Sequence, residues 1–172
     1  MNQKILPFND NLIFFDSEFS SLNPYEGELL SVGMLKPNGE QLYFELEYDG
    51  PYSQWVKNNV LPSLEGPKIT RKKAVKLIKN FIGKKKPHLF AYVPQFDMIY
   101  THKLFVNEKW PFHPFAIDLA SMLFTLGIDP NVLVNQNKDF FNSINIDLEK
   151  YNRHHALEDA ILLRDIYLKL KK

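Results

Sequence analysis

The sequence predicts a mixed α/β fold, because strand-like hydrophobic segments come first and alternate with helical segments afterwards. Three apolar, strand-like runs lie at residues 12–19, 29–35 and 41–48. The second and third are joined by "KPNGE", whose Asn38-Gly39 pair is a strong hairpin signal. The sheet is therefore predicted to open as an antiparallel meander and to continue with parallel strands, flanked by helices.

Helix signals mark the rest of the chain. Ser53 can cap a short helix that Pro62 ends, and Thr70 can cap a longer one with an apolar stripe and a lysine-rich face. The segment "HLFAYV" predicts a short strand, followed by a helix over about residues 97–105. Residues 115–119 are either a last strand or the start of a helix that stops at Gly127. A final helix is predicted from about Ala156 onward.

Length and composition limit the class of protein. A chain of 172 residues is expected to form a single domain, 1–172. It has no cysteine, which excludes disulfides, zinc-thiolate sites and a thiol nucleophile. Its first residues lack the hydrophobic region of a signal peptide, and no apolar stretch is long enough for a membrane span. A soluble, cytoplasmic protein that does not bind membranes is therefore expected.

The charge is unevenly distributed along the chain. Residues 68–86 hold nine of the 21 Lys and Arg and no acid, so the other 12 bases face all 20 acids, which leaves about −8 elsewhere. A basic face on an acidic body would suit a polyanionic partner. A solvated helix surface explains the same run equally simply, and both interpretations remain open.

Two carboxylates interrupt the first predicted strand, "LIFFDSEF". Residues two apart on a strand share a face, so Asp16 and Glu18 lie side by side while Ser17 faces the other way. Their repulsion is about 4 kcal/mol in a typical protein site. A positive group is therefore expected between them, or one carboxyl is protonated.

Two further acids come from separate places in the predicted fold. Asp97 follows the fourth strand at its C-terminal end, where α/β sheets place ligand sites, and Asp159 lies in the first turn of the last helix. If these carboxylates converge with those of the first strand, cations must compensate them. Hard divalent ions such as Mg²⁺ suit oxygen ligands and leave positions for phosphate oxygens.

The motifs in this order resemble a known nuclease family. "FFDSEF", "FD" at Asp97 and "HHALEDA" with His154 and Asp159 are similar to the three exonuclease motifs of the DEDDh 3′–5′ exonuclease superfamily, which has a ribonuclease H-like fold. Within it, the chain looks similar to small bacterial and phage exoribonucleases. One departure is that Tyr92 and Val93 stand where proofreading members carry His-Asn.

The resemblance implies a role for each motif residue. Asp16, Glu18 and Asp159 would share a catalytic metal, and Asp16 and Asp97 a second one, so two Mg²⁺ ions are expected, with Mn²⁺ as a substitute. His154 would be the general base, unless a shifted helix start gives that role to His155.

The same resemblance implies a substrate and a product. The chain would be a metal-dependent hydrolase that shortens single-stranded RNA, in preference to DNA, from its 3′ end and releases nucleoside 5′-monophosphates. Phe19 would meet the terminal nucleotide, or would simply pack in the core. A chain this short is also compatible with a homodimer.

The same residues also allow structural roles and other functions. Asp97 is also a residue type that caps helices, and Asp159 could complement a helix N-terminus. Asp118, Asp147 and Asp165 are expected to be structural. Two further functions remain: a DNA exonuclease of the same superfamily, and a non-catalytic nucleic-acid-binding or scaffold domain. A nucleotide-binding module is disfavoured because the chain lacks a P-loop and G-x-G-x-x-G.

Overall fold

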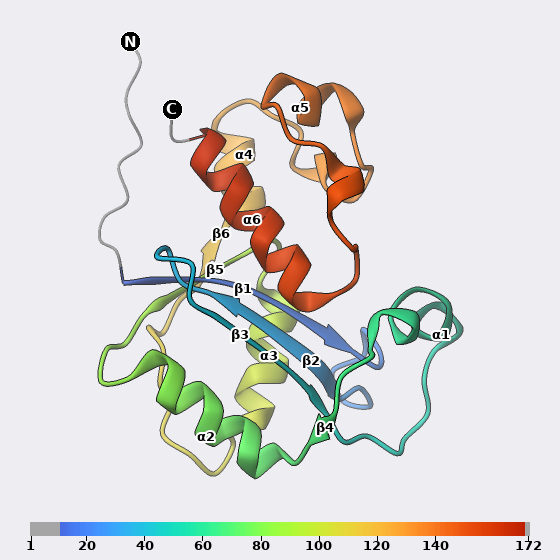
Figure 1. Ribbon diagram of the computed structural model, residues 1–172, viewed down its shortest axis with the longest axis vertical. Helices are drawn as coiled ribbons and strands as arrows, with labels where there is room; N and C mark the ends of the chain where they lie inside the picture. The colour runs from blue at the N-terminus through green and yellow to red at the C-terminus, as the bar shows by residue number, and fades with distance from the viewer. Residues whose placement is uncertain (1–10, 171–172) are drawn as a thin grey trace.

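A six-stranded mixed sheet forms the centre of the computed structural model, which describes residues 11–170 (Figure 1). The strands lie side by side in the order β4-β3-β2-β1-β5-β6. Their bounds are β1 Leu12–Phe19, β2 Leu29–Leu35, β3 Gln41–Leu46, β4 Lys68–Ile69, β5 His88–Ala91 and β6 Ile117–Asp118. The first three strands pair antiparallel, and β5 and β6 continue the sheet in parallel beyond β1. The predicted mixed α/β architecture is thereby confirmed.

Helices cover both faces of this sheet (Figure 1). Those with a full α-helical turn are α1 Gln54–Asn59, α2 Arg71–Ile82, α3 Gln95–Leu104, α4 Leu119–Thr125, α5 Lys138–Ser143 and α6 Ala156–Leu170. Short 3-10 turns span Leu61–Ser63, Pro130–Val132 and Leu148–Lys150. The predicted caps are confirmed, since Ser53 accepts from the Val56 N–H and Thr70 from the Lys73 N–H.

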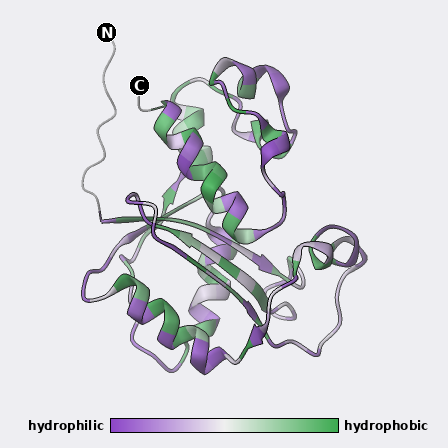
Figure 2. Ribbon diagram, in the orientation of Figure 1, coloured by the Kyte–Doolittle hydropathy of each residue, from purple (hydrophilic) through white to green (hydrophobic). Residues whose placement is uncertain are grey.

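The alternation of side chains along β1 divides the core in two. Ile13 and Phe15 pack with residues of α2 and α3 on one face of the sheet, whereas Leu12 and Phe14 pack with α4 and α6 on the other. In Figure 2, α2 shows this patterning as a hydrophobic stripe against the sheet and a hydrophilic outer face. Asp16 and Glu18 continue the even-numbered series, so they share the α6 face.

A glycine allows α6 to approach the sheet closely. A Cβ built on Gly33 of β2 would lie 2.2 Å from the carbonyl oxygen of Ala156, at the first residue of α6. Gly33 is also the β2 partner of Asp16 in the β1–β2 register. The absence of a side chain at Gly33 therefore brings the start of α6 directly over the carboxylates of β1.

Some boundaries differ from the sequence-based prediction. Strands β3 and β5 end at Leu46 and Ala91, two residues earlier than expected, and residues 115–119 divide between the two-residue strand β6 and the start of α4. The prediction missed β4 and α5. Both are short, and β4 is a strand only because it pairs with Glu45 and Leu46 of β3. Within residues 11–170, none of the helices is long and apolar enough to cross a membrane.

Candidate metal and ligand site

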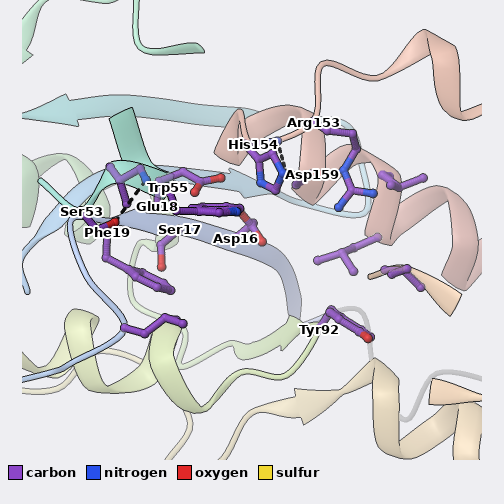
Figure 3. A pocket seen from close by; sticks show the side chains of 15 residues that line it. Asp16, Ser17, Glu18, Phe19, Ser53, Trp55, Tyr92, Arg153, His154 and Asp159 are labelled. Carbon is purple, nitrogen blue, oxygen red and sulfur yellow. Dashed lines mark hydrogen bonds and ion pairs between the residues drawn. The ribbon is translucent and has the colours of Figure 1, made fainter. Parts of the chain in front are cut away.

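A pocket of about 380 Å³ lies beside the start of α6, and the carboxylates of Asp16 and Glu18 on β1 face it (Figure 3). Asp16 and Glu18 line it from the strand, and His154 and Asp159 line it from the helix start. Glu18 and Asp159 are buried, with exposed fractions of 8% each. Of the four carboxylates that the sequence predicted to converge, Asp16, Glu18 and Asp159 line this pocket, together with His154.

His154 is fixed just before α6 by its backbone. Its N–H donates to Asp159 Oδ2 over 2.9 Å, and its φ of +62° turns the chain sharply into the helix. The Ser63 hydroxyl donates to the His154 carbonyl oxygen, and the Trp55 ring meets the imidazole edge-on with ring centroids 5.0 Å apart. The His154 side chain is therefore held over the pocket by both α6 and the α1 segment.

Three of these side chains are close enough to share one ion. Ligand atoms of Glu18, His154 and Asp159 all lie within 4.8 Å of one another. Two carboxylates and an imidazole form a donor set that accepts divalent cations, with hard ions favoured by the oxygens. Asp16 lines the same pocket but is not part of this closest group.

Asp97 occupies a different position from the other three acids. It lies in the first turn of α3, on the opposite face of β1, and is buried there. Its Oδ1 accepts a hydrogen bond of 2.6 Å from the hydroxyl of Ser17, the residue between the two β1 carboxylates. Asp97 does not line the pocket. It contributes to the site electrostatically, since its charge raises the pKa of both Asp16 and Glu18.

Burial and mutual repulsion hold these carboxyls near their protonated forms. Burial raises the pKa of Glu18 to about 8, with repulsion from Asp159 and Asp97 adding to the shift. Burial likewise raises the pKa of Asp97 to about 7, although its bond from Ser17 opposes the change. The pKa values of Asp16 and Asp159 are also raised, in both cases mainly by burial. Such a cluster is ionised at neutral pH only if cations compensate it.

Arg153 brings a positive charge to the cluster, which is one of the two outcomes that the sequence left open. Its Nε lies 2.6 Å from Asp159 Oδ1, and its guanidinium points into the pocket (Figure 3). The contact is an ion pair, whereas Arg153 Nη1 is buried with no hydrogen-bond partner within residues 11–170. One arginine thus faces a cluster of several carboxylates.

The two adjacent histidines have different environments. Burial lowers the pKa of His154, and the opposing attraction of Asp159 is smaller, so the imidazole is neutral and able to donate a lone pair at pH 7. His155 instead stacks on Tyr43 with ring centroids 4.3 Å apart, and its Nδ1 accepts from the Glu158 N–H. His155 is therefore a packing residue in this structure.

The other acids considered from the sequence have structural roles. Asp118 and Asp147 cap the helical segments that follow them, and Asp165 accepts a hydrogen bond from the Tyr151 hydroxyl. Asp97 is not the N-cap of α3, since Pro94 holds that position. Phe19 both lines the pocket and stacks on Tyr100, with ring centroids 4.6 Å apart.

Several lining residues were not foreseen. Leu22 reaches the pocket from the loop after β1, Ser53 and Trp55 from the start of α1, and Tyr92 and Leu133 from the segments after β5 and α4. Leu22 and Trp55 are apolar yet have exposed fractions of 65% and 54%. None of these positions carries a sequence signal, because their meeting depends on loops. The sequence predicted that a positive group could accompany the carboxylates, but it did not identify that group as Arg153, which directly precedes His154.

The basic run predicted over residues 68–86 does not reach this pocket. None of its residues is among those that line the acidic site. It forms β4, α2 and the turn before β5, and α2 packs on the sheet face opposite α6. Direct guidance of a ligand into the acidic pocket by these lysines is therefore not supported.

Comparisons with known proteins identify the fold. No family model matches the chain, and no curated protein matches it. Among the matching solved structures is a chain from the structure of the yeast NOT1 MIF4G domain co-crystallized with CAF1. The likeness has a TM-score of 0.60 at 12% sequence identity and covers 93% of this chain and 79% of that chain. At this identity, the likeness establishes the arrangement of the chain and not its activity.

These comparisons correct the assignment made from the motifs. The matching structure is that of a MIF4G domain co-crystallized with CAF1, and its description names no nuclease activity. Membership of the DEDDh exonuclease superfamily, the exoribonuclease or other hydrolase activity, and a catalytic role for the motif residues are accordingly withdrawn. The physical reason is that short motifs specify where carboxylates lie and not which reaction follows. The position of Asp97 illustrates this limit. Asp97 accepts a hydrogen bond from Ser17, which lines the pocket, but Asp97 itself does not line it.

Proposed function

We propose that this chain is a non-catalytic binding domain whose acidic pocket holds divalent cations and, through them, phosphate groups of single-stranded nucleic acid. The observation that carries the proposal is the convergence of Asp16, Glu18, Asp159 and His154 around one pocket from two separate elements. Only Arg153 opposes their charge from within the pocket lining. Buried like charges in this number favour the binding of cations.

The donor set supports Mg²⁺, with Mn²⁺ as a substitute. Carboxylate oxygens are the ligands that Mg²⁺ prefers, and the imidazole of His154 would be better accepted by Mn²⁺. Asp16, Glu18 and Asp159 would hold the ion, while Asp97 would add negative charge from behind β1. Asp159 Oδ1, which forms an ion pair with Arg153 Nε, is the atom for which such an ion would compete with the guanidinium.

Apolar side chains at the pocket favour a nucleic acid over a free anion. Phe19, Trp55 and Leu22 line the same cavity as the carboxylates, and aromatic surfaces stack nucleobases at about 1–3 kcal/mol per base. A phosphate held by a cation with a base beside it matches this mixed lining. We expect RNA to bind better than DNA if the pocket contacts the 2′-hydroxyl.

The test is a titration of the full chain with labelled single-stranded RNA and DNA of one sequence, in Ca²⁺, Mg²⁺, Mn²⁺ or chelator. Binding that requires a divalent ion and is lost in Glu18→Gln supports the proposal. Glu65→Gln, which changes an exposed acid in the segment before β4, is the matched control. Binding that is equal in Mg²⁺ and in chelator, and that Glu18→Gln leaves unchanged, would refute it.

The length of the recovered oligonucleotide separates binding from turnover. A non-catalytic domain returns it intact in Mg²⁺ and Mn²⁺. Shortening from the 3′ end that disappears in Asp16→Ala would overturn the non-catalytic assignment while leaving the cation site in place.

Protein binding is a second candidate, because the similar solved structure contains two proteins in complex. Exposed apolar side chains at the end of α4 and beyond it supply a surface: Phe124, Leu126 and Val134 have exposed fractions of 71%, 45% and 67%. Sedimentation of the chain over a range of concentrations tests the expected homodimer, and Phe124→Ser should weaken it. A monomer at all concentrations would exclude self-association.

A further inference from the structure

A second cavity, of about 740 Å³, lies at the other end of β1 from the acidic pocket. It is enclosed by the start of β1, the turn between β2 and β3, and the segment that follows α2. Its lining residues are Asn11, Leu12, Ile13, Lys36, Pro37, Asn38, Ile82, Lys84, Lys85 and Pro87. Its volume is within the range of sites that bind small organic ligands.

This cavity is lined by positive charge alone. Lys36, Lys84 and Lys85 contribute three ammonium groups, and none of the lining residues is acidic. Lys36 is compensated by Glu40, whose Oε2 lies 2.6 Å from its Nζ, and it also sits over the Phe81 ring. Lys84 and Lys85 are exposed, and neither forms an ion pair within residues 11–170. Two uncompensated cations therefore face one concave surface.

The backbone holds this lysine turn against β1. Gly83 ends α2 with a φ of +66°, a conformation that glycine adopts without strain, and the chain then turns back toward the sheet. The Asn11 side-chain amide donates to the Lys86 carbonyl oxygen over 2.8 Å, and the Asn11 carbonyl oxygen accepts from the His88 N–H over 3.0 Å. The positions of Lys84 and Lys85 at the cavity are thus set by the fold.

We infer that this basic cavity binds a phosphate-bearing anion. Lysine ammonium groups bind phosphate as point charges, and two of them without acidic partners would be neutralised by one phosphate. The cavity is separate from the acidic pocket: Leu12 and Glu18 are six residues apart on one strand, which is about 20 Å. The inference therefore does not depend on the function proposed for the acidic pocket.

Two sources of phosphate fit this chemistry, and the probes separate them. Inorganic pyrophosphate stands for a free phosphate compound, and a single-stranded oligonucleotide stands for a nucleic-acid backbone. Both are titrated into the full chain in chelator, so that cations in the acidic pocket cannot hold phosphate. Isothermal titration gives the affinity, and amide shifts of residues 36–38 and 83–87 in NMR spectra give the location.

The variant K84Q/K85Q removes the two uncompensated charges. Its control, K72Q/K73Q, removes the same charge from exposed positions in the first turn of α2, about 14 Å away along the helix. We expect K84Q/K85Q to weaken binding of at least one probe by tenfold or more, with the control within about twofold of wild type. Both variants change exposed side chains, and circular dichroism will confirm that they fold.

Each outcome decides the inference. Selective loss for pyrophosphate assigns a free phosphate compound, and selective loss for the oligonucleotide assigns a nucleic-acid backbone. Equal loss in both variants would show non-specific attraction to the basic helix and overturn the inference. Absence of binding by either probe at low salt would overturn it as well.

Discussion

Ser17 Oγ donates a hydrogen bond of 2.6 Å to Asp97 Oδ1, which joins the middle of β1 to the first turn of α3. Ser17 lines the pocket together with Asp16 and Glu18, whereas Asp97 does not. The hydrogen bond stabilises the ionised form of a carboxyl whose pKa burial raises to about 7. Ser17 thus favours the charged form of Asp97, and that charge raises the pKa of Asp16 and Glu18 on either side of Ser17.

Replacing Ser17 tests this relationship. Ser17→Ala removes a bond to the ionised form, so the pKa of Asp97 should rise above about 7, as measured by carboxyl NMR titration. The free energy of unfolding should fall by about 1.5–3 kcal/mol at pH 8.5, with a smaller loss at pH 5, where Asp97 is protonated. Ser143→Ala at the end of α5 is the control. An unchanged Asp97 pKa would show that the bond has no electrostatic weight.

The stability of the metal-free protein should decrease as pH rises. The pKa of Glu18 in the folded state is about 8 against an ordinary 4.5, so the fold binds its proton more tightly than the unfolded chain does. The stabilisation is complete below pH 4.5 and is lost as pH rises through 8, by up to about 1.4 kcal/mol per pH unit. Urea unfolding in chelator at pH 5, 6.5 and 8 measures it. Glu18→Gln should flatten the slope, and an equal slope in that variant would contradict the assignment.

Saturating Mg²⁺ should act in the opposite direction. Cations bind the deprotonated carboxylates, so their stabilising effect should increase between pH 6 and pH 8.5. Thermal unfolding with and without Mg²⁺ over this range provides the measurement. A Mg²⁺ effect that is independent of pH would place the ion away from the Glu18 cluster.

Arg153 should compete with cations for Asp159. Its guanidinium lies 2.6 Å from Asp159 Oδ1, the atom best placed to accept a metal ligand bond. Arg153→Gln should destabilise the metal-free protein by up to about 3 kcal/mol, because it leaves the carboxylates without a counter-charge. The same variant should bind Mn²⁺ about tenfold more tightly by calorimetry at pH 8.5. Arg153→Lys keeps the charge and should show a smaller gain, whereas weaker binding in Arg153→Gln would refute the competition.

The close approach of β2 and α6 should be sensitive to a single methyl group. In Gly33→Ala the added Cβ would meet backbone atoms of Ala156, so the strand and helix must separate, at a cost of about 3 kcal/mol or more. Because Asp16 is opposite Gly33 and Asp159 follows Ala156, cation affinity should fall as well. In the control Gly66→Ala the added Cβ meets side-chain atoms, of which the nearest is Glu45 Oε1 at 3.0 Å, and this variant should cost less. A fully stable Gly33→Ala variant would contradict this packing.

Local patterns were enough to predict most of the fold. The apolar run at residues 12–19, the Asn38-Gly39 turn and the caps Ser53 and Thr70 are each encoded within a few residues, and all are present. The strand β4 was not predictable in this way, because two residues become a strand only by pairing with β3. The motif-based assignment of activity failed for a related reason: motifs place residue types along the chain and do not specify a reaction.

The sequence by itself determined that Asp16 and Glu18 share one face of a strand and that either a positive group accompanies them or one of them is protonated. This follows from the two-residue repeat of a strand and from Coulomb repulsion. Only the tertiary structure decided that Arg153 is the positive group and that Asp97 bonds to Ser17 without lining the pocket itself. It also decided that Lys36, Lys84 and Lys85 gather around a separate cavity. Those outcomes depend on how α3, α6 and the connecting turns pack on the sheet, and such contacts join residues far apart in the chain.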